Sequence, residues 1–251
     1  MLLSNKLKTL PMNPYLINWY LNFLSNRKQR LVFHAMVCEW KHVNKGTMQG
    51  SVSGPHKFNL FINDLEMHNC PNTSLIKFAD DSSLLVPILK NIRDETPRAR
   101  EQFKDCSNAN SMPGNDDKSK ELLFVKKGSA NAVTAVETIN RCSNVKILGL
   151  TFEPTSRFKI HVKEKLVKAN KCLFVIRNLR KDGYSQNEID LLFKSFVLSQ
   201  LTYALSIYAA SPPELTVVQN VLTRCYERNY ISSHINVYSL LESTIFSKIR
   251  K

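Results

Sequence analysis

The hydrophobic pattern changes near Pro154, and this change limits the chain to two kinds of structure placed one after the other. Before this point, short apolar runs typical of strands alternate with helical segments. After it, apolar residues recur at helical spacing over long stretches. The sequence therefore predicts an α+β fold with two domains: a mixed domain over residues 1–153 and an all-helical domain over residues 154–251.

Local signals predict the helices of the first domain. Asn13 followed by Pro14 is a typical helix start, because the asparagine side chain can cap the backbone N–H groups of the first turn. We expect this helix to end at Arg27–Arg30. Gly54–Pro55 predicts a second start, with apolar residues at helical spacing after it. The charged segment Asn91–Asn110 predicts a surface helix.

Strand-forming residues predict the β-structure of the same domain. The segments rich in them are Arg30–Trp40, Leu75–Phe78, Ser83–Val86, Glu121–Lys126 and Lys146–Phe152. Two of these segments flank Ala79–Ser82, which contains Asp80 and Asp81. This arrangement predicts a β-hairpin with two acids at its tip.

The second domain is predicted to be a series of helices. Lys159–Lys181 carries apolar residues at helical spacing and has eight Lys and Arg residues against one acid, Glu164. Ser185–Glu188 has the form of a capping box and predicts a long helix that continues to about Ala210. Ser211–Pro213 then predicts the start of another helix.

The charge balance predicts an anionic partner. The chain of 251 residues has 35 Lys and Arg against 21 Asp and Glu, which gives a formal net charge of +14. This surplus suits a phosphate backbone or an anionic membrane surface. A protein that is merely soluble and basic is the alternative. With 43% hydrophobic residues the chain can bury a core, which argues against disorder of the whole chain.

Nothing in the sequence predicts export or a membrane span. Met1–Lys6 is not followed by the apolar core of a secretory signal, and no window of about 18 residues is continuously apolar. The six cysteines lack metal-ligand spacing, so we expect reduced thiols and neither zinc ligands nor disulfides. These observations predict an intracellular protein of the nucleus or cytoplasm, not secreted and without a membrane partner.

The adjacent acids Asp80 and Asp81 are the most informative residues for chemistry. Two neighbouring carboxylates repel each other and gain stability when a divalent cation binds. In two-metal phosphoryl transfer, carboxylates hold paired metal ions about 3.5–4 Å apart. The alternative is an ordinary acidic turn, because aspartate favours turns. The pair taken by itself favours this alternative.

Several motifs accompany the acidic pair in order along the chain. The segments, written with their sequences, are Thr47–Pro55 (TMQGSVSGP), Phe58–Leu65 (FNLFINDL), Phe78–Asp81 (FADD), Lys118–Glu121 (KSKE) and Val145–Gly149 (VKILG). This ordered set resembles the reverse transcriptases of non-LTR (LINE-type) retrotransposons. The resemblance covers nearly the whole chain.

The resemblance implies an RNA-directed DNA polymerase, a nucleotidyltransferase of transposable elements. Its fold would be a partial right-hand palm, with an antiparallel sheet and helices, followed by a helical thumb and extension. The resemblance implies that Asp80 and Asp81 are catalytic and bind Mg²⁺ or Mn²⁺. It also implies an RNA template, a DNA primer and a deoxynucleoside triphosphate as partners.

The resemblance assigns further residues to substrate and template. Gln49 and Gly50 would lie against the incoming nucleotide and the templating base, where glycine permits close approach of the backbone. Phe78 precedes the acidic pair in the same motif, and Lys118 would sit near the pyrophosphate leaving group. The alternatives are a loop glutamine and a solvated lysine. Lysines of the basic thumb segment would contact the nucleic acid: Lys163, Lys168 and Lys171.

The sequence also departs from the family's pattern. The family's motif A supplies a further metal-binding aspartate, and neither Glu39 nor Asp64 stands at a motif A position. Met48 and Ser53 replace the usual proline and leucine. We therefore expect an N-terminally truncated copy with an incomplete two-metal site and impaired activity. The alternatives are a non-catalytic, basic nucleic-acid-binding remnant and a degenerate copy that does not fold stably.

Overall fold

The computed structural model describes residues 2–43, 45–68, 70, 72–88, 94–125, 133 and 135–249. It divides the chain into two compact units, Met1–Asp116 and Asp117–Lys251. The change of pattern at residues 153/154 lies inside the second unit, because strand β10 (Leu150–Phe152) packs against helix α5 (Lys159–Lys181).

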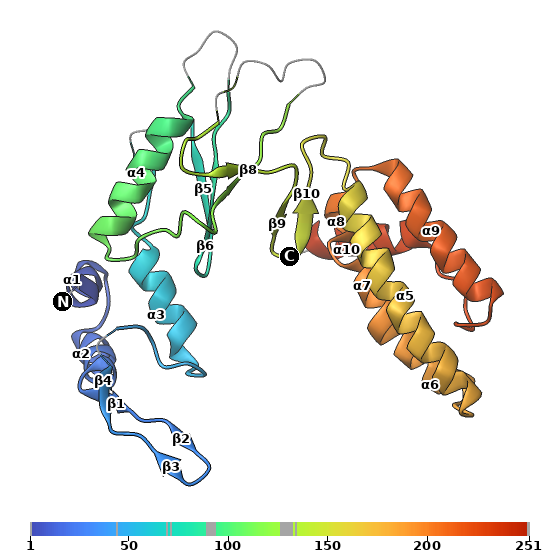
Figure 1. Cartoon of the computed structure of the whole chain (residues 1–251), viewed down its shortest axis with the longest axis horizontal. Helices are drawn as coiled ribbons and strands as arrows, with labels where there is room; N and C mark the ends of the chain where they lie inside the picture. Colours follow the sequence, from blue (N-terminus) through green and yellow to red (C-terminus); the bar gives the residue numbers. More distant parts are fainter. Residues whose placement is uncertain are drawn as a thin grey trace. The chain divides into compact units, whose positions relative to one another are not determined.

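The first unit contains α1 (Leu2–Thr9), α2 (Pro14–Leu24), α3 (Ser53–Ile62) and α4 (Thr96–Ala109), all drawn in Figure 1. The predicted start of α2 is confirmed, because the Asn13 side chain accepts a hydrogen bond from the Tyr15 N–H at 2.9 Å. The buried side chains of Leu7, Ile17 and Tyr20 join α1 and α2 in a small core.

The strand region after α2 differs from its prediction. The helix ends at Leu24, not at Arg27–Arg30. The chain then forms an extended hairpin whose strands are β1 (Arg27–Gln29), β2 (Val32–Phe33), β3 (Met36–Val37) and β4 (Lys41–Val43). The strand-forming segment Arg30–Trp40 thus contains β2, β3 and the turn that joins them. The reversal falls at His34, whose positive φ of 52° turns the chain back on itself.

The predicted acidic hairpin is confirmed. Strands β5 (Ser74–Phe78) and β6 (Asp81–Leu85) pair in antiparallel fashion, with Phe78 opposite Asp81. Only Ala79 and Asp80 connect the strands, and Ala79 takes a positive φ of 49°, which such short turns require.

The strands of the second unit are shorter than predicted. Strand β7 (Lys120–Glu121) pairs in parallel with β8 (Asn140–Arg141), and β9 (Val145–Ile147) pairs in antiparallel fashion with β10. The prediction over Glu121–Lys126 is thus confirmed only at its first residue, and Lys126 lies outside the described residues. The predicted strand Lys146–Phe152 is a hairpin, because Leu148 and Gly149 both take positive φ values of 48° and 80°.

The helices of the second unit follow the predicted spacing. Helix α5 has the predicted bounds, and its apolar positions are buried or half-buried: Val162, Leu166, Ala169, Leu173 and Ile176. Helix α9 (Pro212–Glu227) starts where Ser211–Pro213 predicts. The chain ends with α10 (Val237–Ile249). Together with the segment between α5 and α9 these helices enclose the larger core of the chain.

The long helix predicted over 185–210 is interrupted. Its capping box is present, since the Ser185 N–H donates to the Glu188 carboxylate at 2.8 Å. The segment then runs through α6 (Gln186–Leu192), a π-helical turn η2 (Phe193–Leu198), α7 (Ser199–Thr202) and α8 (Leu205–Tyr208). The break between α7 and α8 lies at Ala204, whose φ of 59° cannot continue a right-handed helix.

The fold class is α+β, as predicted. Within the described residues the strands form five separate two-stranded ladders, of which four are antiparallel and one is parallel. These ladders therefore do not join into the single antiparallel sheet that a polymerase palm would have. The polymerase architecture remains a proposal.

Candidate functional site

The candidate site lies at the tip of the β5–β6 hairpin. Asp80 occupies the two-residue turn, and Asp81 is the first residue of β6. Both side chains are exposed, and neither carboxylate forms a hydrogen bond or an ion pair with any residue that the structure describes. Two uncompensated, solvated carboxylates at adjacent positions make this tip able to attract a divalent cation.

Phe78 lies directly across the ladder from Asp81. The two residues form the last pair before the turn, so their side chains project to the same face of the hairpin. Phe78 is 60% exposed, although it is a large apolar residue. An exposed ring beside an exposed carboxylate can offer a stacking surface next to the charge.

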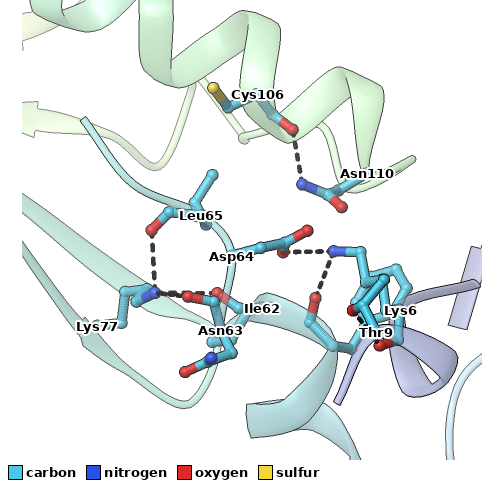
Figure 2. Close-up of polar contacts among 10 residues, drawn as sticks. Lys6, Thr9, Ile62, Asn63, Asp64, Leu65, Lys77, Cys106 and Asn110 are labelled. Carbon is cyan, nitrogen blue, oxygen red and sulfur yellow. Dashed lines mark hydrogen bonds and ion pairs between the residues drawn. The ribbon is translucent and has the colours of Figure 1, made fainter. Parts of the chain in front are cut away.

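Lys77 attaches the hairpin to the end of α3. Its Nζ donates to the carbonyl oxygens of Ile62 at 2.9 Å, Asn63 at 3.2 Å and Leu65 at 2.9 Å, as Figure 2 shows. The last carbonyl groups of a helix lack partners within the helix, and a cation interacts favourably with that end. This contact therefore holds the acidic tip in a defined place relative to the FNLFINDL segment.

Lys6 holds the same end of α3 from the other side. Its Nζ donates to the Phe61 carbonyl oxygen at 2.6 Å and to the Asp64 carboxylate at 2.5 Å (Figure 2). Asp64 lies just past the end of α3 and serves in this ion pair. Its carboxylate thus has a structural partner 58 residues earlier in the chain.

Gln49 and Gly50 lie in the exposed loop between β4 and α3. Gly50 has a φ of 81°, a conformation that favours glycine, and a Cβ added there would meet no atom within 4 Å. The backbone at Gly50 is thus open to a ligand. Among the residues that the structure describes, the Gln49 side chain forms no hydrogen bond with Asp80 or Asp81, so the structure does not join these positions directly.

Lys118 belongs to the second unit, in an exposed turn before β7. Nearby, the ladder of β7 and β8 is closed by an ion pair between Arg141 and Glu121, with Nε and Oε2 2.8 Å apart.

The three predicted nucleic-acid lysines are exposed on α5 but do not form one narrow stripe. Successive residues of a helix are rotated by about 100°, so Lys163 and Lys168 face directions about 140° apart, with Lys171 between them. They give the helix a broad basic outer surface. A neighbouring cation, Lys165, lies over the ring of Tyr203, with 4.1 Å from Nζ to the centroid.

Sequence reasoning passed over two residues whose side chains join separate elements of the structure. Lys77 carried a signal, because it is the one charged residue in an otherwise apolar strand segment, Leu75–Phe78. His161 is fully buried and accepts a hydrogen bond from the Thr151 N–H at 3.3 Å. Burial, and then the charge of Lys165, lower the pKa of His161. A histidine within a basic helical segment gave no sign of this role.

The residues of the hairpin fit a divalent cation in part. Mg²⁺ is commonly held by one or two carboxylates together with substrate phosphates. Asp80 and Asp81 supply two such groups, and within the described ranges no cluster of three or more His, Cys, Asp or Glu side chains comes together. No described helix is long and apolar enough to cross a bilayer.

The chain was compared with protein-family models, curated proteins and solved structures, and none of the three comparisons gives a match.

Proposed function

We propose that this chain is the palm and thumb part of an RNA-directed DNA polymerase of the non-LTR retrotransposon type. The observation that carries the proposal is the ordered motif set in the sequence, with FADD as its central element. The geometry of the β5–β6 hairpin supports it, because Asp80 and Asp81 are exposed at a tight tip fastened to α3 by Lys77. Carboxylates used in metal-dependent phosphoryl transfer need such a rigid support.

In this proposal Asp80 and Asp81 would hold Mg²⁺ or Mn²⁺. When bound, the metal would supply charge stabilisation to the oxygens of the transferred phosphoryl group. The chain's own residues would position the reactants. Phe78 would offer its exposed ring to a base or sugar beside Asp81, and the open backbone at Gly50 would permit close approach of the nucleotide.

The test is primer extension by the full chain on an RNA template with a DNA primer, with and without Mg²⁺. We expect weak extension that requires the metal and falls to background in Asp80→Asn and Asp81→Asn. Asp105→Asn is the matched control, because Asp105 is an exposed acid on α4 that takes no part in the hairpin.

A direct readout of the metal accompanies the activity. Mn²⁺ binding measured by electron paramagnetic resonance should weaken in Asp80→Asn and stay unchanged in Asp105→Asn. Extension that survives both hairpin substitutions, or Mn²⁺ binding that is indifferent to them, would contradict the proposal.

A second candidate is a non-catalytic nucleic-acid-binding protein, favoured by the charge of α5. This helix has eight Lys and Arg residues against one acid. Binding by phosphate contacts should weaken with salt, with a slope of roughly 0.7–0.9 per contact in a plot of log affinity against log salt. Salt-dependent binding without any metal-dependent extension would favour this candidate, and binding that does not respond to salt would exclude it.

A further inference from the structure

A groove of about 420 Å³ lies between α5 and α9 in the second unit. The two helices can be followed in Figure 1, where α5 is yellow and α9 is orange. Apolar side chains, among them Leu173 and Val221, form part of its lining, and three arginines line it as well: Arg177, Arg224 and Arg228. None of its eleven lining residues is acidic. The lining of the groove therefore combines apolar side chains with positive charge.

The arginines of the groove keep hydrogen-bonding capacity for a ligand. Arg177 donates through Nε to the Tyr230 hydroxyl at 3.0 Å, and Arg224 donates through Nε to the Asn220 carbonyl oxygen at 3.2 Å. These contacts orient the guanidinium groups, while their terminal Nη groups have no hydrogen-bond partner among the described residues. Guanidinium forks of this kind match the geometry of a phosphate group.

Arg180 shows the contrasting arrangement one turn further along α5. Its Nη1 donates to the Asn229 carbonyl oxygen at 2.7 Å, just past the end of α9. That side chain is used to fasten the two helices together. The chain thus assigns one arginine of this region to structure and leaves the groove arginines available.

Aromatic rings accompany the cations. Phe174 lines the groove and is 61% exposed, and Tyr230 lines it with the Arg177 guanidinium 6.0 Å from its ring centroid. Grooves that bind unpaired nucleic acid combine positive charge along the backbone with aromatic side chains on which bases stack. In a duplex the base faces are already stacked on each other, so the bases are not free to stack on the ring of Phe174.

Basic residues extend the groove along α5. Lys163, Phe174 and Lys181 recur at intervals close to whole turns, so they lie on one side of the helix over about 27 Å. We propose that the α5–α9 groove binds an unpaired nucleic-acid strand, with phosphates on Arg177, Arg224 and Arg228 and a base on Phe174. The inference deepens the proposed function, since it names the form of nucleic acid that the helical unit takes.

The test measures anisotropy of a fluorescent single strand of about 12 nucleotides, a length within the range bound by single-strand modules. The variant Arg177→Gln/Arg224→Gln removes two positive charges from the groove. The control Lys8→Gln/Lys104→Gln removes the same charge from exposed positions on α1 and α4 of the first unit, to which no binding role is assigned. We expect the dissociation constant to rise about tenfold or more in the first variant and about threefold or less in the control. The groove variant should also lower the salt slope by about 1.4, the value for two lost contacts with a single strand.

Phe174→Leu separates stacking from charge and leaves an exposed position apolar. We expect at least a roughly fivefold loss for the single strand, in line with the usual contribution of stacking, and little change for a duplex of the same length. Equal losses in the two double variants, a duplex bound as tightly as the strand, or a poly-glutamate peptide that competes as well as the strand would each overturn the inference.

The test of the polymerase proposal is independent of the test of strand binding by the groove. The Asp80→Asn/Asp81→Asn variant should bind the single strand like the unchanged chain, because the assay requires no nucleotide addition. Loss of extension with intact strand binding supports both ideas, and strand binding without any extension by the unchanged chain supports the groove alone.

Discussion

The Nζ of Lys77 lies 2.9 Å from the carbonyl oxygen of Ile62, so this side chain fastens the strand that leads to the acidic tip to the end of α3. The same amine reaches the carbonyl oxygens of Asn63 and Leu65. A methionine at this position would keep the apolar stem and lose all three hydrogen bonds.

We expect Lys77→Met to lower the free energy of unfolding by about 2 kcal/mol, since hydrogen bonds that involve a charged group contribute more than neutral ones. Urea denaturation measures the change. Lys104→Met, an exposed lysine of α4, is the control and should change it little. A loss no larger than that of the control would show that Lys77 does not hold the hairpin.

Lys57 on α3 is a buried cation packed on aromatic rings. It is 2% exposed, its Nζ has no hydrogen-bond partner among the described residues, and it lies 3.6 Å from the centroid of the Phe23 ring. Burial and then the charge of Arg27 lower the pKa of Lys57. Because the cost of the buried charge outweighs its attraction to the rings, Lys57→Met should stabilise the chain by about 1 kcal/mol.

The same shift predicts how stability depends on pH at this position. The unfolded chain keeps the Lys57 proton up to its ordinary pKa of 10.5, whereas the folded chain releases it at lower pH. Stability should therefore rise as the pH increases toward 10.5, and Lys57→Met should abolish this part of the rise when stability at pH 7 is compared with stability at pH 10. Denaturation at the two pH values measures it, and Lys8→Met is the exposed control.

Because of His161, the stability of the second unit should depend on pH in the acidic range. Its folded pKa lies below the ordinary 6.5, so the unfolded chain binds the proton first as the pH falls. The stability that the neutral ring contributes is complete above pH 6.5 and is lost as the pH falls below it. His161→Asn keeps an acceptor for the Thr151 N–H but does not titrate. Between about pH 7 and pH 5, this variant should lose less stability than the unchanged chain.

Gly149 permits the tight turn between β9 and β10. It has a φ of 80°, and a Cβ added there would lie 3.2 Å from the hydroxyl oxygen of Tyr203, which itself donates to the Leu148 carbonyl oxygen. Gly149→Ala should therefore destabilise the second unit by about 1–2 kcal/mol. Thermal unfolding monitored by circular dichroism measures this, and the variant Gly183→Ala, where a Cβ meets nothing within 4 Å, isolates the backbone cost from the contact with Tyr203.

The sequence predicted those elements whose causes are local. The start of α2 at Asn13–Pro14, the bounds of α5 and the acidic hairpin depend on caps, spacing and turn residues within a few positions of each other. Their predictions are confirmed for this reason.

The predictions that were wrong depend on contacts made far along the chain or on rare backbone states. The interruption of the helix after Ser185 requires Ala204 to take a left-handed conformation beside Tyr203, whose hydroxyl reaches Leu148, 55 residues earlier. At the candidate site, the sequence identified Asp80 and Asp81 but not the support from Lys77, because which carbonyl groups a lysine reaches is decided by packing. The function assigned to the acids remains a proposal.

The short turn of the acidic hairpin makes the tip intolerant of changes in length. Side chains of a strand alternate between its two faces, so one residue inserted between Ala79 and Asp80 would have to be absorbed by the turn or would shift the pairing of β6 by one position. In the second case the side chain of Asp81 would move to the face opposite Phe78. Insertions and deletions at this turn should therefore be tolerated less well than substitutions, even substitutions of the exposed residues around it.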